Sequence, residues 1–569
     1  MSIWAKLYRY YNTVKYLKLV QIIYQLRYRI FGFTNQSNDV TYETHNRDFN
    51  LAIPELDFDE NYINRFKVEK ILQNEITLLN EVMQWGTGKW VDSSKTHLWN
   101  FNLHYFEYGI ALVQKYKEKK EISYLEKFKE LYLDWHEYFI SKKNSDAWHP
   151  YTISLRIKNL LICLDILQDE MAEDESFFDL LIQDIYVMYL YLTKNQEKNL
   201  LGNHYFENLT AIYIASIFFC EKSVSDKFEK KIQNEISEQI LEDGIHYERS
   251  MMYHNLILED LLRIYVCTNK REQRNDEFMN SLQTKICQMS DAVYSLEFRN
   301  SERIPLFNDA GSNVSKTANQ LLTAVGEMLQ YRPIKKYSFK NAGYYSLENK
   351  ELKVIFDCGE IASDYISGHG HCDALSFEMF YQNVPVLVNA GTFQYQTKLR
   401  QFFRSNQAHN TVQIDDRNQS EVWGEHRTAR RMEIEKVIEY TPNKVCGKIQ
   451  TYQKDLIQRK LELENRVLKI NDEVSRTKDK EKTVIRSYFR VHPDFKVENG
   501  RKETEKIIIH KKSNLRIYIL TSEGKWILHK TDICHYAEQF GILENTEVLE
   551  LCQEISEKIF EQNVTISIA

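Results

Sequence analysis

The amino-acid sequence predicts a multidomain α+β protein, an incomplete α/α toroid of antiparallel helices followed by an antiparallel β-sandwich. Apolar residues recur at helical spacing from about residue 60 to 330, whereas short alternating apolar and polar runs begin near residue 337. The length of 569 residues also exceeds what one ordinary core accommodates. We therefore expect a basic, aromatic N-terminal helical segment (1–60), a toroid domain (61–335) and a sandwich domain (336–569).

Eight segments of the first half carry the helical pattern. They are residues 103–113, 124–139, 153–167, 177–192, 205–219, 256–265, 286–296 and 321–329. The connections between them are short and polar, so successive helices should run antiparallel. An array of such hairpins can close into a toroid with a central cleft.

The second half carries strand patterns instead. Alternating runs at residues 352–358, 384–388, 411–414, 506–510 and 515–520 are separated by Gly, Asn and Asp, which favour turns. This texture is typical of an antiparallel sandwich.

Composition narrows the class of protein. With 43% hydrophobic residues the chain is globular, and its net charge of −7 is spread through mixed-sign sequence, which argues against a nucleic-acid partner. The 13% aromatic content mildly favours carbohydrate binding, because aromatic faces stack on sugar rings. The nine cysteines are scattered without a CxxC pair, which favours free thiols in a reducing compartment.

The first 31 residues contain six basic residues, no acidic residue and many aromatic ones. Such a segment either packs on the body of the protein, which is the simpler interpretation, or makes peripheral contact with an anionic membrane surface. No secretory signal and no long apolar stretch is found, so we expect a cytoplasmic protein without a transmembrane span.

Four polar clusters interrupt the apolar patterns. In the sandwich half, Gly368-His-Gly-His-Cys-Asp373 brings two histidines and a carboxylate together between flexible glycines. In the helical half the clusters are Trp148-His-Pro-Tyr151 with Arg156, Gly202-Asn-His-Tyr-Phe-Glu-Asn208 and Asp243-Gly-Ile-His-Tyr-Glu-Arg-Ser-Met-Met-Tyr-His254. Each could be a buried polar network that ties helices together, but all four in one chain favour a functional site.

At these clusters the sequence resembles the heparinase II/III-like polysaccharide lyases, relatives of the alginate lyases. The resemblance runs from about residue 95 onward and also includes Leu98-Trp-Asn-Phe-Asn-Leu-His-Tyr-Phe-Glu-Tyr108, Leu306-Phe-Asn-Asp-Ala310, Phe403-Arg-Ser-Asn-Gln-Ala-His-Asn-Thr-Val412 and Gln419-Ser-Glu-Val-Trp423. It implies a toroid followed by a sandwich, with a cleft between them that binds an acidic polysaccharide. It also implies β-elimination, in which the C5 proton of a uronic acid is removed and the C4 oxygen leaves, without an organic cofactor.

The resemblance assigns catalytic roles to named residues. Asn203 is expected to neutralise the substrate carboxylate, with His204 beside it as a further donor or as a base, and Glu207 is expected to orient His204. Tyr253 is expected to be the acid and, for suitable stereochemistry, also the base. His369 is implied as a second base or carboxylate contact from the sandwich.

Further residues are implied as substrate contacts. A tyrosine that acts as a base must be made more acidic by nearby cations, for which Arg249 and His254 are candidates, and Tyr247 competes with Tyr253 for the catalytic role. Trp148, Tyr151 and Arg156 complete the set of predicted substrate-binding residues.

The family's sandwich often holds a zinc ion. The corresponding positions here are His371, Asn389 and His409, and Asn389 stands where the family usually has an aspartate. A neutral amide is a poorer zinc ligand than a carboxylate, although Asp373 could compensate or could instead cap local amides. Any such metal is expected to brace the loop that carries His369.

Three functions remain in view from sequence. The preferred one is a lyase acting on a uronate-containing glycan, heparin/heparan-like or alginate-like, within the machinery that produces a surface polysaccharide. The alternative is a non-catalytic glycan-binding or assembly factor with the same fold. A metal-dependent hydrolase centred on His369, His371 and Asp373 is weaker, because no glycosidase-like pair of carboxylates is found.

Overall fold

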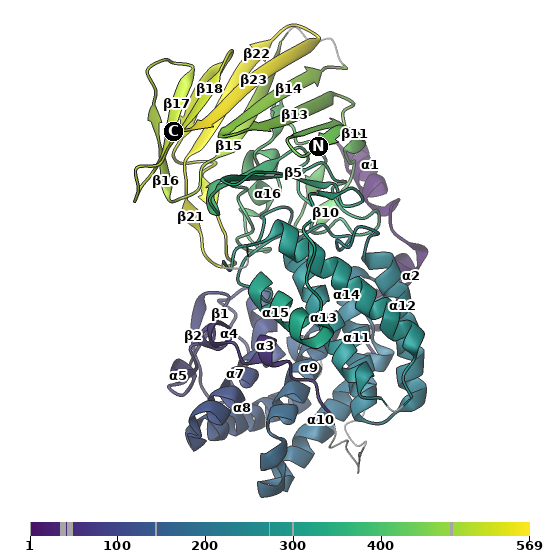
Figure 1. The fold of residues 1–569 in the computed structure, drawn as a ribbon. Coiled ribbons are helices and arrows are strands. Elements are labelled where there is room, and N and C mark those ends of the chain that lie inside the picture. The colour runs from purple at the N-terminus through teal and green to yellow at the C-terminus, as the bar shows by residue number, and fades with distance from the viewer. Residues whose placement is uncertain are drawn as a thin grey trace.

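The computed structural model describes residues 2–34, 41–42, 49–142, 145–271, 273–298, 301–477 and 482–569. Helices build one half of the molecule and sheets the other, as Figure 1 shows. The last long helix ends at Leu329 and the first strand of the sheet half begins at Ser338. The predicted fold class is confirmed.

The helical half is made of packed helices around one large core. Its long helices are α6 (His97–Tyr105), α7 (Glu107–Lys119), α8 (Ile122–Ser141), α9 (Pro150–Ile166), α10 (Glu175–Lys194), α11 (Gly202–Phe218), α12 (Lys222–Gln239), α13 (Met251–Asn269), α14 (Asp276–Leu296) and α15 (Ala318–Leu329). Short elements precede or join them: α3 (Pro54–Asp57), α4 (Glu60–Asn64), α5 (Val68–Ile71), β1 (Glu75–Leu78), β2 (Glu81–Gln84), η1 (Asp146–Trp148) and η2 (Gln168–Glu173). None of the helices in the described part of the chain is long and apolar enough to cross a membrane.

One predicted helix is divided. The pattern over residues 103–113 suggests one helix, but α6 ends and α7 begins at Phe106, whose φ of 59° lies in the left-handed region. Phe106 is fully buried and packs between Trp90 and Trp135. The aromatic core fixes this turn, and apolar periodicity alone does not reveal it.

The sheet half consists of antiparallel strands. A five-stranded sheet has the order β3 (Ser338–Phe339), β4 (Tyr344–Glu348), β5 (Leu352–Asp357), β6 (Phe377–Tyr381), β7 (Val384–Leu387). An eight-stranded sheet has the order β11 (Glu433–Thr441), β12 (Lys444–Gln450), β13 (Leu456–Glu464), β14 (Val467–Ser475), β23 (Ile559–Ile568), β18 (Arg516–Thr521), β17 (Glu505–His510), β16 (Phe495–Asn499). A four-stranded sheet has the order β19 (Lys525–His529), β22 (Val548–Ile555), β15 (Thr483–Arg490), β8 (Val412–Ile414).

These three sheets share one apolar core, which includes Phe356, Leu461 and Phe489. The loops that face the helices hold α16 (Arg400–Phe403), η3 (Asn406–Ala408) and the short strand pairs β9 (Val422–Trp423) with β10 (Arg427–Thr428) and β20 (His535–Tyr536) with β21 (Glu544–Asn545). The shared core therefore holds the three sheets together, and loops from these sheets reach the helical half. All nine cysteines are free thiols in the structure.

The N-terminal helices α1 (Ile3–Val14) and α2 (Leu19–Phe31) lie against both halves. Figure 1 shows α1 beside the sandwich and α2 beside α12. Arg9 forms an ion pair with Glu421 on the sandwich side, and Gln21 donates to the carbonyl of Leu200 on the helical side. This arrangement agrees with the simpler of the two predictions for the segment.

Candidate active site

A large cleft of about 590 Å³ lies between the two halves. Its walls come from α6, α9, α11 and α13, from sandwich loops at residues 365–369, 395–396 and 426–431, and from α1 and α2. The predicted catalytic residues Asn203, His204, Glu207, Tyr253 and His369 all line it. The cleft thus gathers side chains that are far apart in sequence.

Asn203 lies at the start of α11, and the buried carboxylate of Glu248 fixes its amide. Its Nδ2 lies 3.0 and 3.1 Å from the two oxygens of Glu248, and its backbone N–H donates to the same carboxylate at 3.1 Å. This contact requires glycine at position 202, where φ is +63° and a Cβ would lie 2.9 Å from Glu248 and 2.8 Å from Ile366. The Asn203 Oδ1 atom is buried and has no partner among the described residues.

The imidazole of His204 is held by a different carboxylate. Its Nδ1 lies 3.0 Å from Oε1 of Glu197, and its ring contacts Tyr151 with centroids 4.4 Å apart. Burial alone would lower the pKa of His204, but ionised Glu197 outweighs burial and raises it. The prediction that Glu207 orients His204 is wrong, because Glu197 does so.

Glu207 belongs to a buried charge cluster on the floor of the cleft. Lys158 lies 2.6 Å from Glu207 and also forms an ion pair with Asp260. Burial, together with the charge of Asp260, raises the pKa of Glu207 to about 8 although Lys158 opposes the shift. This carboxyl group therefore holds a proton in a pH range where an exposed glutamate has lost it.

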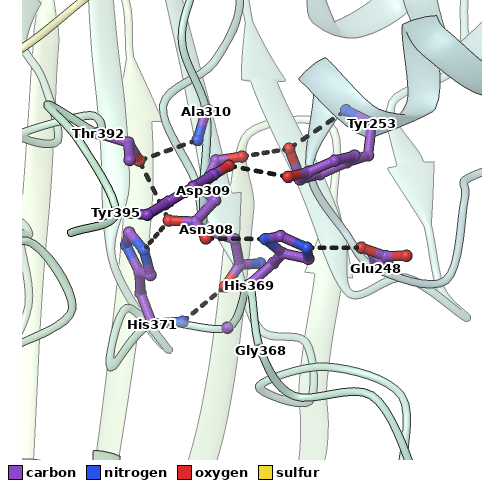
Figure 2. Close-up of polar contacts among 12 residues, drawn as sticks. Glu248, Tyr253, Asn308, Asp309, Ala310, Gly368, His369, His371, Thr392 and Tyr395 are labelled. Atoms are coloured by element: carbon purple, nitrogen blue, oxygen red, sulfur yellow. Dashed lines mark hydrogen bonds and ion pairs between the residues drawn. The ribbon is translucent and has the colours of Figure 1, made fainter. Parts of the chain in front are cut away.

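Tyr253 is positioned by the first turn of α13. Ser250 caps this helix by accepting from the Tyr253 N–H, and its hydroxyl donates to the Asp309 carbonyl at 2.6 Å. Figure 2 shows the phenol beside His369 and Tyr395: the Tyr253 ring is 4.3 Å from the His369 ring, and its hydroxyl is 2.8 Å from that of Tyr395. Burial, reinforced by Tyr395 and Asp309, raises the pKa of Tyr253 well above its ordinary value.

One buried carboxylate, Asp309, organises the sandwich wall. Both of its oxygens accept from Arg400, and it also lies 2.9 Å from Nδ1 of His369 and 2.9 Å from Nε2 of His371. Thr392 adds a bond at 3.3 Å. Burial would raise the pKa of Asp309, but the Arg400 guanidinium and the two histidines lower it well below its usual range. Figure 2 shows this carboxylate between the two imidazoles.

Two of the predicted substrate contacts are part of the scaffold. Trp148 stacks on Phe139 at 4.2 Å and donates to its carbonyl, and Arg156 is fully buried and donates to the carbonyls of His104 and Ala147. Neither lines the cleft. Their polar groups satisfy backbone oxygens between helices instead of meeting substrate.

Three further candidates also lie behind the cleft wall. Arg249 donates from Nε to the carbonyl of Ala342, and His254 contacts the carbonyl of Met289 at 3.0 Å. Burial lowers the pKa of His254 to about 3, so this imidazole is neutral and does not make Tyr253 more acidic. Tyr247 is buried and outside the lining. Of the six predicted contacts, Tyr151 lines the cleft.

Three buried residues behind His369 have the arrangement of a metal site. Ligand atoms of His371, Asp373 and His409 lie within 4.8 Å of one another. The His371 Nδ1 and both nitrogens of His409 have no partner among the described residues, and burial lowers the pKa of both imidazoles, which leaves them neutral. Two neutral imidazoles and a carboxylate fit zinc. Asn389 as a ligand stays a prediction; its Oδ1 accepts from the Asn410 N–H at 3.3 Å.

Several site residues were not identified from sequence. Glu248 and Asp309 lie inside motifs that were recognised, but no role was assigned to them, and Glu197, Tyr395 and His426 lie outside those motifs. Glu248 offered a usable signal, since a carboxylate within a cluster of histidine and arginine seldom stays unpaired when buried. Tyr395 and His426 approach His369 only through the sandwich loops, with ring centroids at 6.0 and 5.9 Å.

Comparison with known families gives a direct assignment. The model described as "Heparinase II/III N-terminus" matches residues 33–337, and the one described as "Heparinase II/III-like, C-terminal" matches residues 332–559. The chain belongs to the heparinase II/III family. The two matches meet between the last long helix and the first strand of the sheet half.

Relatives within the heparinase II/III family are distant in sequence. A heparin-sulfate lyase of Pedobacter heparinus is 21% identical over 56% of this chain and 52% of its own length. A heparin-sulfate lyase of Bacteroides thetaiotaomicron is 22% identical over 62% of this chain and 57% of its own length. The chain thus spans about half the length of these curated relatives. A crystal structure of heparinase III superposes with a TM-score of 0.71 at 15% identity over 96% of this chain and 89% of that one, which shows a shared fold.

Proposed function

We propose that this protein is a polysaccharide lyase that cleaves a uronic-acid-containing glycan of the heparin/heparan or alginate type by β-elimination. One observation carries the proposal: the Tyr253 phenol and the His369 imidazole, from opposite halves, lie 4.3 Å apart in the cleft that Asn203 also lines. These are the acid, base and neutral donor that the reaction needs. Relatives named heparin-sulfate lyase support the substrate class.

His369 is suited to accept the C5 proton. Asp309 is held ionised, so its contact with Nδ1 favours the proton on that nitrogen and leaves a lone pair on Nε2. The Nε2 atom lies 3.7 Å from a Glu248 oxygen. After proton transfer the imidazolium would lie between the carboxylates of Asp309 and Glu248.

Tyr253 is suited to protonate the leaving C4 oxygen. Its raised pKa keeps the phenol neutral, and neither Arg249 nor His254 is placed to make it a base. Asn203 and a protonated His204 then face the charge that develops on the substrate carboxylate. The raised pKa of His204 supports the role of donor over that of base.

The test is ultraviolet absorbance during incubation with heparin, heparan sulfate and alginate. A lyase gives the absorbance of a new C4=C5 double bond conjugated to the carboxylate, and Tyr253→Phe should abolish it. Saturated reducing ends in place of that chromophore would indicate a hydrolase. Binding without either product would indicate the glycan-assembly factor and would refute the lyase.

A zinc ion held by His371, Asp373 and His409 is part of the proposal. Such an ion would brace the loop of His369, because Asp309 contacts both His369 and His371. Metal analysis of purified protein should find zinc near one equivalent, and His409→Ala should lose it and lower the melting temperature. A second set, Asp309, His369 and His426, also has suitable spacing, but Arg400 occupies both Asp309 oxygens.

The outer surface of α1 and α2 supports peripheral contact with a membrane where the glycan would be made. Ile3 and Trp4 are 77% and 80% exposed. Exposed apolar residues continue along both helices at Leu7, Tyr11, Val14, Leu19, Ile23, Leu26, Ile30 and Phe31. With basic neighbours and no acid, this surface suits anionic lipid. Co-sedimentation with phosphatidylserine vesicles but not phosphatidylcholine vesicles is expected, and Trp4→Glu should weaken it.

A further inference from the structure

Two arginines on one rim of the cleft lie over aromatic rings. The Arg427 guanidinium lies 4.8 Å from the centre of the Trp423 ring, its partner in the β9–β10 pair. The Arg431 guanidinium lies 3.8 Å from the ring of Tyr16, which follows α1. Both arginines line the cleft. Stacking covers the face of a guanidinium and leaves the N–H groups at its edge available.

The other basic residues of the cleft contrast with this pair. Arg65 is 2.6 Å from Glu107, and Lys158 and Arg263 are each bound by two carboxylates. Lys316, also inside, donates to the Leu56 carbonyl over the ring of Tyr62. These cations are already occupied by protein groups.

Neither Arg427 nor Arg431 has an ion pair or a side-chain hydrogen bond with any residue in the described part of the chain, and the Arg431 Nε is buried without a partner. Glu360 and Asp364 lie near enough to act on the pKa of Arg431 but form no ion pair with it. A donor buried without an acceptor is costly. The rim therefore presents two positioned cations that form no ion pair with the described part of the chain.

Helix α1 and the residues directly after it hold or supply the aromatic rings that these two arginines contact. Thr13 accepts from Nε1 of Trp423 at 3.1 Å, and Tyr10 packs edge-on against the same ring at 5.1 Å. The ion pair of Arg9 with Glu421 fastens the helix to the sandwich at 2.8 Å. The N-terminal segment is thus part of the cleft wall as well as a covering of the protein's body.

We propose that Arg427 and Arg431 form an anion subsite that binds a carboxylate or sulfate of a second acidic sugar, next to the sugar that is cleaved. The identity of the ligand as an acidic polysaccharide rests on the proposed function. Planar guanidinium groups bind carboxylates and sulfates through paired N–H donors, which gives both affinity and register. The subsite makes α1 a determinant of which length of chain binds.

The experiment compares binding of heparan sulfate tetrasaccharide, which has a second uronate, and disaccharide, which has one, to the Tyr253→Phe variant, which holds substrate without turning it over. Adding Arg431→Ala or Arg427→Ala should weaken tetrasaccharide binding about tenfold, the loss of one charge-assisted contact. Disaccharide binding should change by less than about twofold. Tyr16→Leu, which removes the stacking ring but no charge, should weaken the tetrasaccharide in the same way.

Arg501→Ala is the matched control, because Arg501 is exposed in the connection between β16 and β17, outside the cleft lining, and its substitution changes the net charge equally. Equal weakening of both oligosaccharides, or no change in either, would overturn the subsite. Length-dependent weakening in a protein whose wild type forms no unsaturated product would keep the subsite and reject the lyase. Normal lyase activity with no length dependence would keep the lyase and reject the subsite.

Discussion

The two walls of the cleft hold their reactive groups in different ways. On the helical wall Asn203 and His204 are held by separate carboxylates, those of Glu248 and Glu197. On the sandwich wall one carboxylate, Asp309, serves Arg400, His369 and His371 together. The helical wall should therefore tolerate single losses that leave the neighbouring groups in place, whereas the sandwich wall should fail as a unit.

The largest expected effect is that of Asp309→Asn. The substitution leaves the buried Arg400 without its counterion, so the free energy of unfolding should fall by about 3–5 kcal/mol and lyase activity should be lost. Urea denaturation measures the stability. Glu197→Gln on the helical wall is the comparison, with an expected loss of about 1–3 kcal/mol. Equal losses would contradict the contrast between the walls.

Tyr253→Phe tests chemistry without disturbing the scaffold. Removing one hydroxyl should lower kcat by about 10²–10⁴-fold, while the melting temperature stays close to that of wild type. Tyr395→Phe removes the hydroxyl that contacts it at 2.8 Å and should cost far less activity. If Tyr395→Phe were the more damaging change, the acid would have to be reassigned to Tyr395.

Glu207, on the floor of the cleft, should make the unfolding free energy depend on pH. Its pKa is raised from 4.5 to about 8, so the folded state binds more protons than the unfolded state between these values. The unfolding free energy should therefore fall as pH rises through this window. Glu207→Gln should flatten that part of the stability curve. An unchanged pH dependence in the variant would show that Glu207 is ionised throughout.

The smallest expected effect concerns His204. Its raised pKa means that the cationic form, and the stability from its contact with Glu197, are fully present below the unfolded value near 6.5 and are lost as pH rises through the folded value. If the cation faces the substrate carboxylate, kcat/KM should fall along an alkaline limb. His204→Gln should lower kcat/KM and remove that limb. Persistence of the limb in the variant would assign it to another group.

Much of the fold could be predicted from sequence, because periodicity reports which faces of helices and strands are buried. The family resemblance, which rests on motifs in a fixed order, also implied a cleft lined by Asn203, His204, Tyr253 and His369. All four line it. Periodicity did not predict the turn at Phe106, since a left-handed residue inside an apolar run depends on the aromatic side chains packed around it.

The direction in which polar side chains point was harder to predict. Arg156 looks like a cleft residue on a mixed helix, but it turns inward to the carbonyls of His104 and Ala147. The resemblance made Glu207 look like the partner of His204, whereas Glu197 reaches it from a preceding loop. Such partners are set by contacts between distant segments, which a single sequence does not display.

The most direct test of the central claim is a crystal structure of the Tyr253→Phe variant with a bound heparan sulfate tetrasaccharide. We expect one uronate with its carboxylate toward Asn203 and His204, its C5 beside Nε2 of His369 and its O4 facing residue 253. A uronate bound away from these groups, or with C5 facing neither wall, would contradict the account.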